Sequence, residues 1–243
     1  MGQIAYRADN GEIVEAFSLS DLDWEEICSS PAGTLLMPRT DWPAVPKTSI
    51  RGLRFFSHHA GYPEKLPAPK SYAHTRLQID IARIARQLGF RAELETYGSE
   101  PSGSDWIADV LVESSKGARV AFEVQLSSQS LDDFIERSDR YKRSNINACW
   151  FISEKPVASR LCKALCHRNI EYYTATGNFL ADDSKIVTFN IDMPSKDTYP
   201  ESLPPIRFGR GKNIRRLSLA ESIYGMMHNF PCWELPDWKW IES

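Results

Sequence analysis

The chain has 243 residues, of which 42% are hydrophobic and 25% are charged. This length has room for one domain with an appendage or for two small domains, and the hydrophobic content excludes wholesale disorder. The formal net charge of −3 excludes a globally basic nucleic-acid binder, so any contact with DNA must come from local basic patches.

Residues 1–60 have little hydrophobic periodicity, which predicts a small N-terminal module of strands and loops. Residues 13–17 are the clearest candidate strand. We expect four apolar side chains to hold the module together, namely Trp24, Leu35, Leu36 and Phe55. Three prolines within residues 61–70 then indicate a linker.

Residues 71–88 form the clearest predicted helix, because apolar residues recur at helical spacing and Gly89 follows as a stop signal. His74 lies at the start of this apolar stripe, with Gln78 one turn later. Two interpretations of His74 remain open. It is either a histidine at the core edge that bonds a backbone carbonyl, or a side chain directed across the sheet toward a metal ion or a phosphate.

A β-hairpin is the strongest signal in the chain. A strand at 90–95 and a Gly/Ser/Pro loop at 97–105 are expected first. Apolar runs at 108–112 and 120–126 follow, with a Ser-Lys-Gly turn between them. These two runs predict adjacent antiparallel strands.

Each strand of this hairpin carries an acid. Centring the hairpin on Lys116-Gly117 puts Asp109 opposite Glu123, with Cβ atoms roughly 4.5–5.5 Å apart. Strand alternation puts Gln125 on the same face as Glu123. Two carboxylates this close repel unless a cation lies between them, and oxygen ligands favour Mg²⁺ or Mn²⁺. The alternative is a pair of solvent-facing acids on an edge hairpin, but helices predicted on both sides imply a covered sheet, where unpaired charge is costly.

The chain then continues as an α/β layer. Ser130 begins a predicted helix, with Asp133 in the position of a capping box. The further elements expected are a strand at 148–152, a helix at 157–168 and strands near 170–174 and 185–191.

Residues 201–243 are predicted to form a basic and aromatic helical extension. Its basic residues, with no acid among them, are Arg207, Arg210, Lys212, Arg215 and Arg216. Such a run either contacts DNA or serves solubility, and the sequence leaves both open. The aromatic residues near the end indicate docking on the body of the domain or on a partner.

The hairpin pattern D-x13-E-x-Q resembles the core of PD-(D/E)xK nucleases, with Gln in place of the usual Lys. The surrounding residues resemble one branch of that superfamily, the competence protein CoiA-like family, over roughly residues 50–155. The matching segments are 55–59, 73–74, 94–95, 108–111, 122–127, 136–141 and 150–152. The chain departs from the family at Gln78, where a Lys is often found.

The resemblance implies a restriction-endonuclease-like core at residues 71–200, with a central mixed sheet flanked by helices. It implies a metal-dependent nuclease that hydrolyses DNA phosphodiester bonds in natural transformation, recombination or defence. Asp109 and Glu123 would hold Mg²⁺ or Mn²⁺, and Gln125 and His74 would join them in catalysis. Because Gln125 carries no charge, a catalytically weak or inactive DNA-binding accessory protein of the same fold remains the alternative.

The resemblance also implies DNA as the partner, with recombination or defence proteins as further partners. For Arg137 and Tyr141 the alternative is that they belong to a solvated face of their helix. The expected DNA-binding residues are Gln78, Arg137, Tyr141, Arg207, Arg210 and Lys212. The oligomeric state stays open.

The N-terminal module resembles the zinc ribbon of CoiA-like proteins in a degenerate form. Cys28 keeps one position of the C-x2-C knuckle, and Pro31 replaces the other. A structural zinc ion needs four ligands, and the module offers Cys28, His58 and His59 as candidates. We therefore expect no structural zinc.

The sequence also predicts where the protein works. The five cysteines lack disulfide-like spacing, which indicates a reducing cytoplasm. No apolar run approaches the roughly 20 residues of a membrane span, and the N-terminus lacks signal-peptide character. We expect a cytoplasmic protein with no membrane partner.

Overall fold

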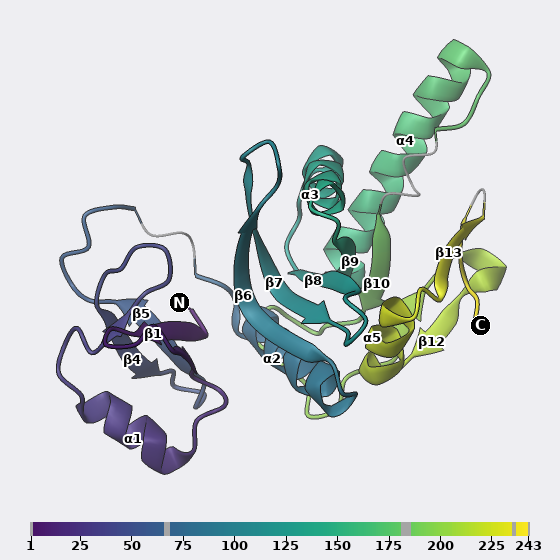
Figure 1. Ribbon diagram of the computed structural model, residues 1–243. Helices are drawn as coiled ribbons and strands as arrows, with labels where there is room; N and C mark the ends of the chain where they lie inside the picture. Colours follow the sequence, from purple (N-terminus) through teal and green to yellow (C-terminus); the bar gives the residue numbers. More distant parts are fainter. Residues whose placement is uncertain (1, 66–68, 181–185, 235–236, 243) are drawn as a thin grey trace. The chain divides into compact units, whose positions relative to one another are not determined.

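The chain folds into two compact units, Met1–Lys70 and Ser71–Ser243 (Figure 1). The computed structural model describes residues 2–65, 69–180, 186–234 and 237–242. Residues 66–68 of the expected linker and Lys185 of an expected strand lie outside the described residues. Each unit is considered by itself.

The first unit is a small β module with one helix. β1 is the middle strand of a three-stranded sheet in the order β2-β1-β3, and β4 pairs with β5. The strands are β1 (Ile4–Arg7), β2 (Ile13–Glu15), β3 (Leu35–Leu36), β4 (Ala44–Thr48) and β5 (Arg54–His58). Helix α1 (Asp21–Ser29) was not expected from the sequence. Ser20 caps it by accepting a hydrogen bond from the backbone N–H of Asp23.

The apolar core of the first unit lies between α1 and the strands. Trp24 packs on Phe56 with ring centroids 5.7 Å apart, and Leu35 and Phe55 are buried as expected. The buried positions of α1 are only Trp24 and Ile27, which explains why its sequence gave a weak helical pattern.

The candidate zinc ligands of the first unit do not form a cluster. Cys28 is exposed on α1, and His58 Nε2 lies 3.1 Å from the Thr40 hydroxyl. Among the residues that the structure describes, no three His, Cys, Asp or Glu side chains come together in a way that could hold a metal ion. The absence of zinc stays a prediction for elemental analysis of the purified protein.

The second unit is built on a mixed seven-stranded sheet in the order β12-β11-β10-β9-β8-β7-β6. β8, β9 and β10 run parallel to one another, and the other neighbouring pairs are antiparallel. The strands are β6 (Arg91–Ser99), β7 (Asp105–Glu113), β8 (Arg119–Gln125), β9 (Asn147–Ser153), β10 (Val187–Ile191), β11 (Ile206–Phe208) and β12 (Arg215–Leu217). The expected central mixed sheet is confirmed.

Two pairs of helices cover this sheet (Figure 1). α2 contacts α5, and α3 contacts α4. The helices are α2 (Tyr72–Gln87), α3 (Leu131–Arg143), α4 (Ser159–Thr176) and α5 (Leu219–Met227). The predicted capping box at Ser130 and Asp133 is present at the start of α3. A kinked turn (Glu154–Ala158), in which Lys155 has an extended backbone, precedes α4, and a 3₁₀ turn (Gly211–Asn213) precedes β12.

A row of aromatic rings runs across four neighbouring strands of the sheet. The ring contacts join Phe122 to Phe151, Phe151 to Phe189 and Phe189 to Phe208, with centroids 5.2–6.2 Å apart. Trp240 closes this row by contacting both Phe189 and Phe208. Trp240 belongs to the hairpin of β13 (Pro231–Glu234) and β14 (Asp237–Trp240), so the C-terminal aromatics dock on the body of the domain.

Two expectations for the second half of the chain are wrong. The strand expected near 170–174 is instead the end of α4, which stops only where Gly177 adopts a left-handed conformation with φ of 70°. Residues 201–243 are only partly helical, because β11 and β12 extend the central sheet. Among the described residues of this range, α5 is the one α-helix. The loop expected at 97–105 is also shorter, since β6 and β7 extend into it.

No helix within the described ranges is both long enough and apolar enough to cross a membrane.

The docking of the C-terminal hairpin can be tested at Gly225 of α5. A Cβ added there would lie 2.2 Å from ring atoms of Trp240. Alanine favours a helix over glycine by about 1 kcal/mol, but overpacking costs about 1–3 kcal/mol. We expect Gly225→Ala to lower the free energy of unfolding by up to about 2 kcal/mol in urea denaturation. This cost should shrink in a Trp240→Leu background; an undiminished cost would contradict the contact.

Candidate active site

The hairpin of β7 and β8 sets two acids level with each other. The register pairs Val110 with Phe122 and Leu111 with Ala121, as the position of the turn predicts. Asp109 precedes Val110 and Glu123 follows Phe122, so the same register extended by one residue puts these two acids opposite each other. Their exposed fractions are 8% and 1%, so the interpretation of a solvent-facing pair is wrong. Buried carboxylates need hydrogen-bond donors or cations around them.

Asp109 is held by α2 and by the backbone of β8. Its Oδ1 accepts a hydrogen bond of 2.7 Å from Gln78 Nε2, and its Oδ2 accepts one of 2.9 Å from the N–H of Val124. His74 Nε2 lies 3.3 Å from the same Oδ2. The strand pairing between β6 and β7 skips the level of Asp109, where Glu95 has a φ of 50°. The β6–β7 pairing is thus interrupted at the residue whose side chain bonds to α2.

Glu123 is held by α3. Its Oε2 accepts a hydrogen bond of 2.5 Å from Arg137, and its Oε1 accepts one from the Tyr141 hydroxyl. The Arg137 guanidinium lies over the ring of Trp150, 4.6 Å from its centroid. Arg137 and Tyr141 are one helical turn apart on the face of α3 that carries the buried Phe134.

The charges of this group shift the pKa values of its members. Burial, reinforced by the Glu123 carboxylate, raises the pKa of Tyr141, so its hydroxyl stays protonated and donates. Burial disfavours the charge on Arg137, but the carboxylates of Glu123 and Asp109 outweigh it and raise the pKa of the guanidinium. Burial and Glu123 also raise the pKa of the Cys149 thiol, which excludes a thiolate nucleophile there.

The donor set beside Asp109 fits a divalent cation in its chemistry. Gln78 Oε1 and His74 Nε2 are both buried and have no hydrogen-bond partner. A carboxylate and an amide oxygen suit Mg²⁺ or Mn²⁺, and an imidazole nitrogen is a further metal ligand. Across the described part of the chain, however, no three His, Cys, Asp or Glu side chains form a metal-holding group. A cation shared by Asp109 and Glu123 stays a prediction.

Gln125 bonds to the residues that follow β8. Its Nε2 donates to the backbone oxygen of Ser127 at 2.6 Å, and the side chain is half-buried at the end of β8. The positive charge next to Glu123 comes instead from Arg137. The sequence placed Arg137 only among DNA contacts, although its spacing of four residues from Tyr141 and three from Phe134 indicated a sheet-facing position.

The expected DNA-binding residues divide into interior and surface groups. Gln78 and Tyr141 are 0% and 1% exposed and form hydrogen bonds with Asp109 and Glu123. The expectation that these two side chains contact DNA from the surface is therefore wrong. Arg207 forms an ion pair with Glu154. Arg210 and Lys212 are exposed around the 3₁₀ turn before β12, at the sheet edge opposite β6.

A family model described as competence protein CoiA, nuclease-like domain, matches residues 70–192. The chain belongs to this family. The matched range runs from α2 to β10 and contains all the residues around Asp109 and Glu123 described above. No curated protein and no solved structure matches the chain. The mixed sheet flanked by helices fits the nuclease-like description of the CoiA domain, and the first unit and residues 193–243 lie outside the match.

The ion pair of Glu123 in this CoiA domain predicts a large stability effect. Arg137→Ala would leave a carboxylate with 1% exposure without its cation. Breaking a buried ion pair costs about 3–5 kcal/mol of folding stability. Because the Arg137 side chain is 34% exposed, we expect the free energy of unfolding to fall by about 3 kcal/mol, the lower end of this range. Urea unfolding at neutral pH measures it.

The matched control is Arg91→Ala in β6. Arg91 pairs with Glu93 at the same 2.5 Å distance but is 71% exposed, so its loss should cost less than about 1 kcal/mol. Glu123→Gln should recover part of the stability of Arg137→Ala. Equal costs for the two arginines would contradict the assignment of Arg137 to the buried pair.

Proposed function

We propose that the chain is a metal-dependent nuclease of the PD-(D/E)xK type that hydrolyses DNA phosphodiester bonds. The observation that carries this proposal is the pair of buried acids, Asp109 and Glu123, level on adjacent strands of a CoiA nuclease-like domain. A buried acid pair is costly for folding and is a frequent feature of catalytic sites. The reaction would serve DNA processing in transformation, recombination or defence.

The residues of the site have distinct parts in this proposal. Asp109, Glu123 and the buried Gln78 Oε1 and His74 Nε2 would hold Mg²⁺ or Mn²⁺. When bound, the cation would polarise a phosphate oxygen and lower the pKa of a bound water. Arg137 keeps a permanent positive charge beside the acids. This charge stabilises negative charge that develops on the phosphate, which the uncharged Gln125 cannot do.

A DNA-binding accessory protein of the same fold is the second candidate. It is favoured by the state of Glu123, whose two oxygens already accept hydrogen bonds from Arg137 and Tyr141. A cation bound through the remaining lone pairs of Glu123 would have to share this carboxylate with the positively charged Arg137 guanidinium. In this second candidate the pair of Glu123 and Arg137 has a structural role alone.

The first functional prediction concerns the two acids. We expect the wild type to cut DNA only with Mg²⁺ or Mn²⁺, and Asp109→Asn or Glu123→Gln to lower the rate at least about 100-fold by removing a metal ligand. Binding to the same DNA should stay within about threefold, because phosphate contacts come from other residues. Gel assays of cleavage and fluorescence anisotropy measure the two effects.

The control for both variants is Asp132→Asn on α3, because this carboxylate is 92% exposed and away from the acids. It should leave cleavage unchanged. A wild type that binds DNA in a salt-sensitive manner but cuts neither single- nor double-stranded DNA with either metal would favour the accessory protein.

The variant Gln125→Lys tests whether the active site binds one cation or two. If Gln125 occupies the position of the superfamily's Lys, an added ammonium should maintain or raise the cleavage rate, because it adds charge stabilisation at the phosphate. If two cations are bound, the ammonium should repel one of them and lower the rate. The rate as a function of Mn²⁺ concentration, compared with Gln125→Met as an uncharged control, measures the difference.

A further inference from the structure

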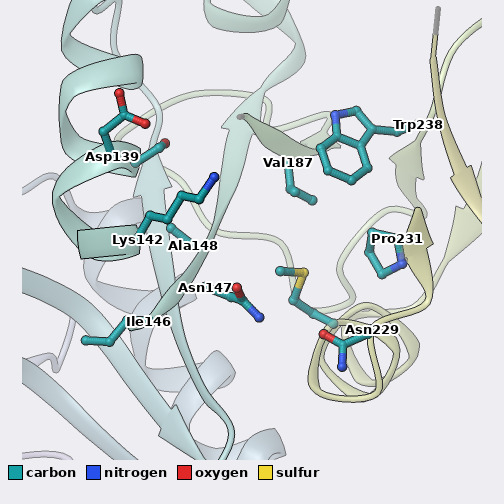
Figure 2. A pocket seen from close by; sticks show the side chains of 11 residues that line it. Asp139, Lys142, Ile146, Asn147, Ala148, Val187, Asn229, Pro231 and Trp238 are labelled. Carbon is teal, nitrogen blue, oxygen red and sulfur yellow. The ribbon is translucent and has the colours of Figure 1, made fainter. Parts of the chain in front are cut away.

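A cavity of about 250 Å³ lies in the second unit between α3, the start of β9 and the C-terminal hairpin (Figure 2). Its apolar wall includes Met226, Pro231 and the indole of Trp238. Its polar wall includes Lys142 and Asn147. Ligand sites combine apolar walls with a few polar groups in this way.

The two walls come from different parts of the chain. Lys142 and Asn147 belong to the range matched by the nuclease-like family, residues 70–192. Met226 and Trp238 lie beyond that range. The cavity therefore depends on the docking of the β13–β14 hairpin, which the contacts of Trp240 with the aromatic row hold in place. It is a feature of this chain in addition to the nuclease-like domain.

The groups that line the cavity match the chemistry of a nucleotide. An indole offers a flat face on which any nucleobase can stack, and the amides of Asn147 and Asn229 offer both donors and acceptors to base edges. The Lys142 ammonium extends toward the Trp238 side of the cavity (Figure 2). Asp139 is the other charged lining residue, so the lining is neutral in sum, which suits one phosphate better than a polyphosphate.

Helix α3 connects this cavity to the buried acids. Arg137 contacts Glu123, and Lys142, five residues later, lines the cavity. Five residues correspond to about 7.5 Å along a helix axis. Between them, Ser138 lines the cavity and accepts a hydrogen bond from Trp150, the residue whose ring lies under Arg137.

We propose that this cavity binds one nucleobase with its phosphate, the base stacked on Trp238 and the phosphate at Lys142. The ligand is a nucleotide of a single DNA strand that passes along α3, or a free nucleotide of the same chemistry. In choosing DNA the inference rests on the proposed function, but base binding itself does not require catalysis.

The test is the binding of a fluorescein-labelled 12-nucleotide single strand, measured by anisotropy with EDTA present so that cleavage has no influence. Trp238→Leu keeps an apolar side chain without a stacking face and should raise Kd at least about fivefold. Trp238→Phe should recover most of the affinity. The matched control is Trp233→Leu, because Trp233 belongs to the same hairpin and contacts Trp238 without lining the cavity.

Two further arms separate base from phosphate and strand from free nucleotide. On a strand of the same length made entirely of abasic sites, Trp238→Leu should have no effect. Lys142→Ala should weaken binding of both strands, whereas Lys163→Ala, an exposed lysine of α4, should not do so to the same extent. Saturable binding of dAMP that Trp238→Leu removes would show that free nucleotides also enter.

The proposal is overturned if Trp238→Leu and Trp233→Leu weaken binding equally, or if the abasic strand is as sensitive to Trp238→Leu as the normal strand. These outcomes are independent of the nuclease assay. A protein that cuts no DNA can still bind a base here, and an active nuclease can fail this test.

Discussion

The structure of the second unit depends on one constraint, the burial of two carboxylates at the same level of adjacent strands. Each carboxylate has its own donors: Asp109 uses α2 and the backbone of β8, and Glu123 uses α3. Removing a donor from a buried carboxylate is costly, so these contacts fix where both helices cross the hairpin. The arrangement positions Gln78, His74 and Arg137 around the acids.

The aromatic row across β8 to β11 provides the second organising contact. It is apolar and continuous, and Trp240 extends it to the C-terminal hairpin. The hairpin in turn closes the cavity beside Lys142. Packing in the core therefore sets the shape of a cavity whose lining combines residues inside the matched family range with residues of the C-terminal part. The C-terminal part is an integral component of the second unit.

Local patterns predicted much of this fold and part of the site. Helix 71–88, the hairpin and its register followed from periodicity and turn position, because these depend on residues close in sequence. The orientation of Gln125 and the pairing of Arg137 with Glu123 did not follow, since they depend on which helix reaches which carboxylate. The error at 170–174 has a similar origin: β-branched and aromatic residues suggested a strand, but no helix-stopping residue precedes Gly177.

The central claim is that Asp109 and its neighbours form a divalent-cation site in a nuclease-like domain. The most direct measurement is an anomalous difference map from crystals of the full chain grown with Mn²⁺. The account predicts a peak within bonding distance of an Asp109 carboxylate oxygen, absent in Asp109→Asn crystals. The claim of a cation site would be contradicted by a map at saturating Mn²⁺ that has no peak near Asp109. In that structure Gln78 and His74 would contact only each other or water.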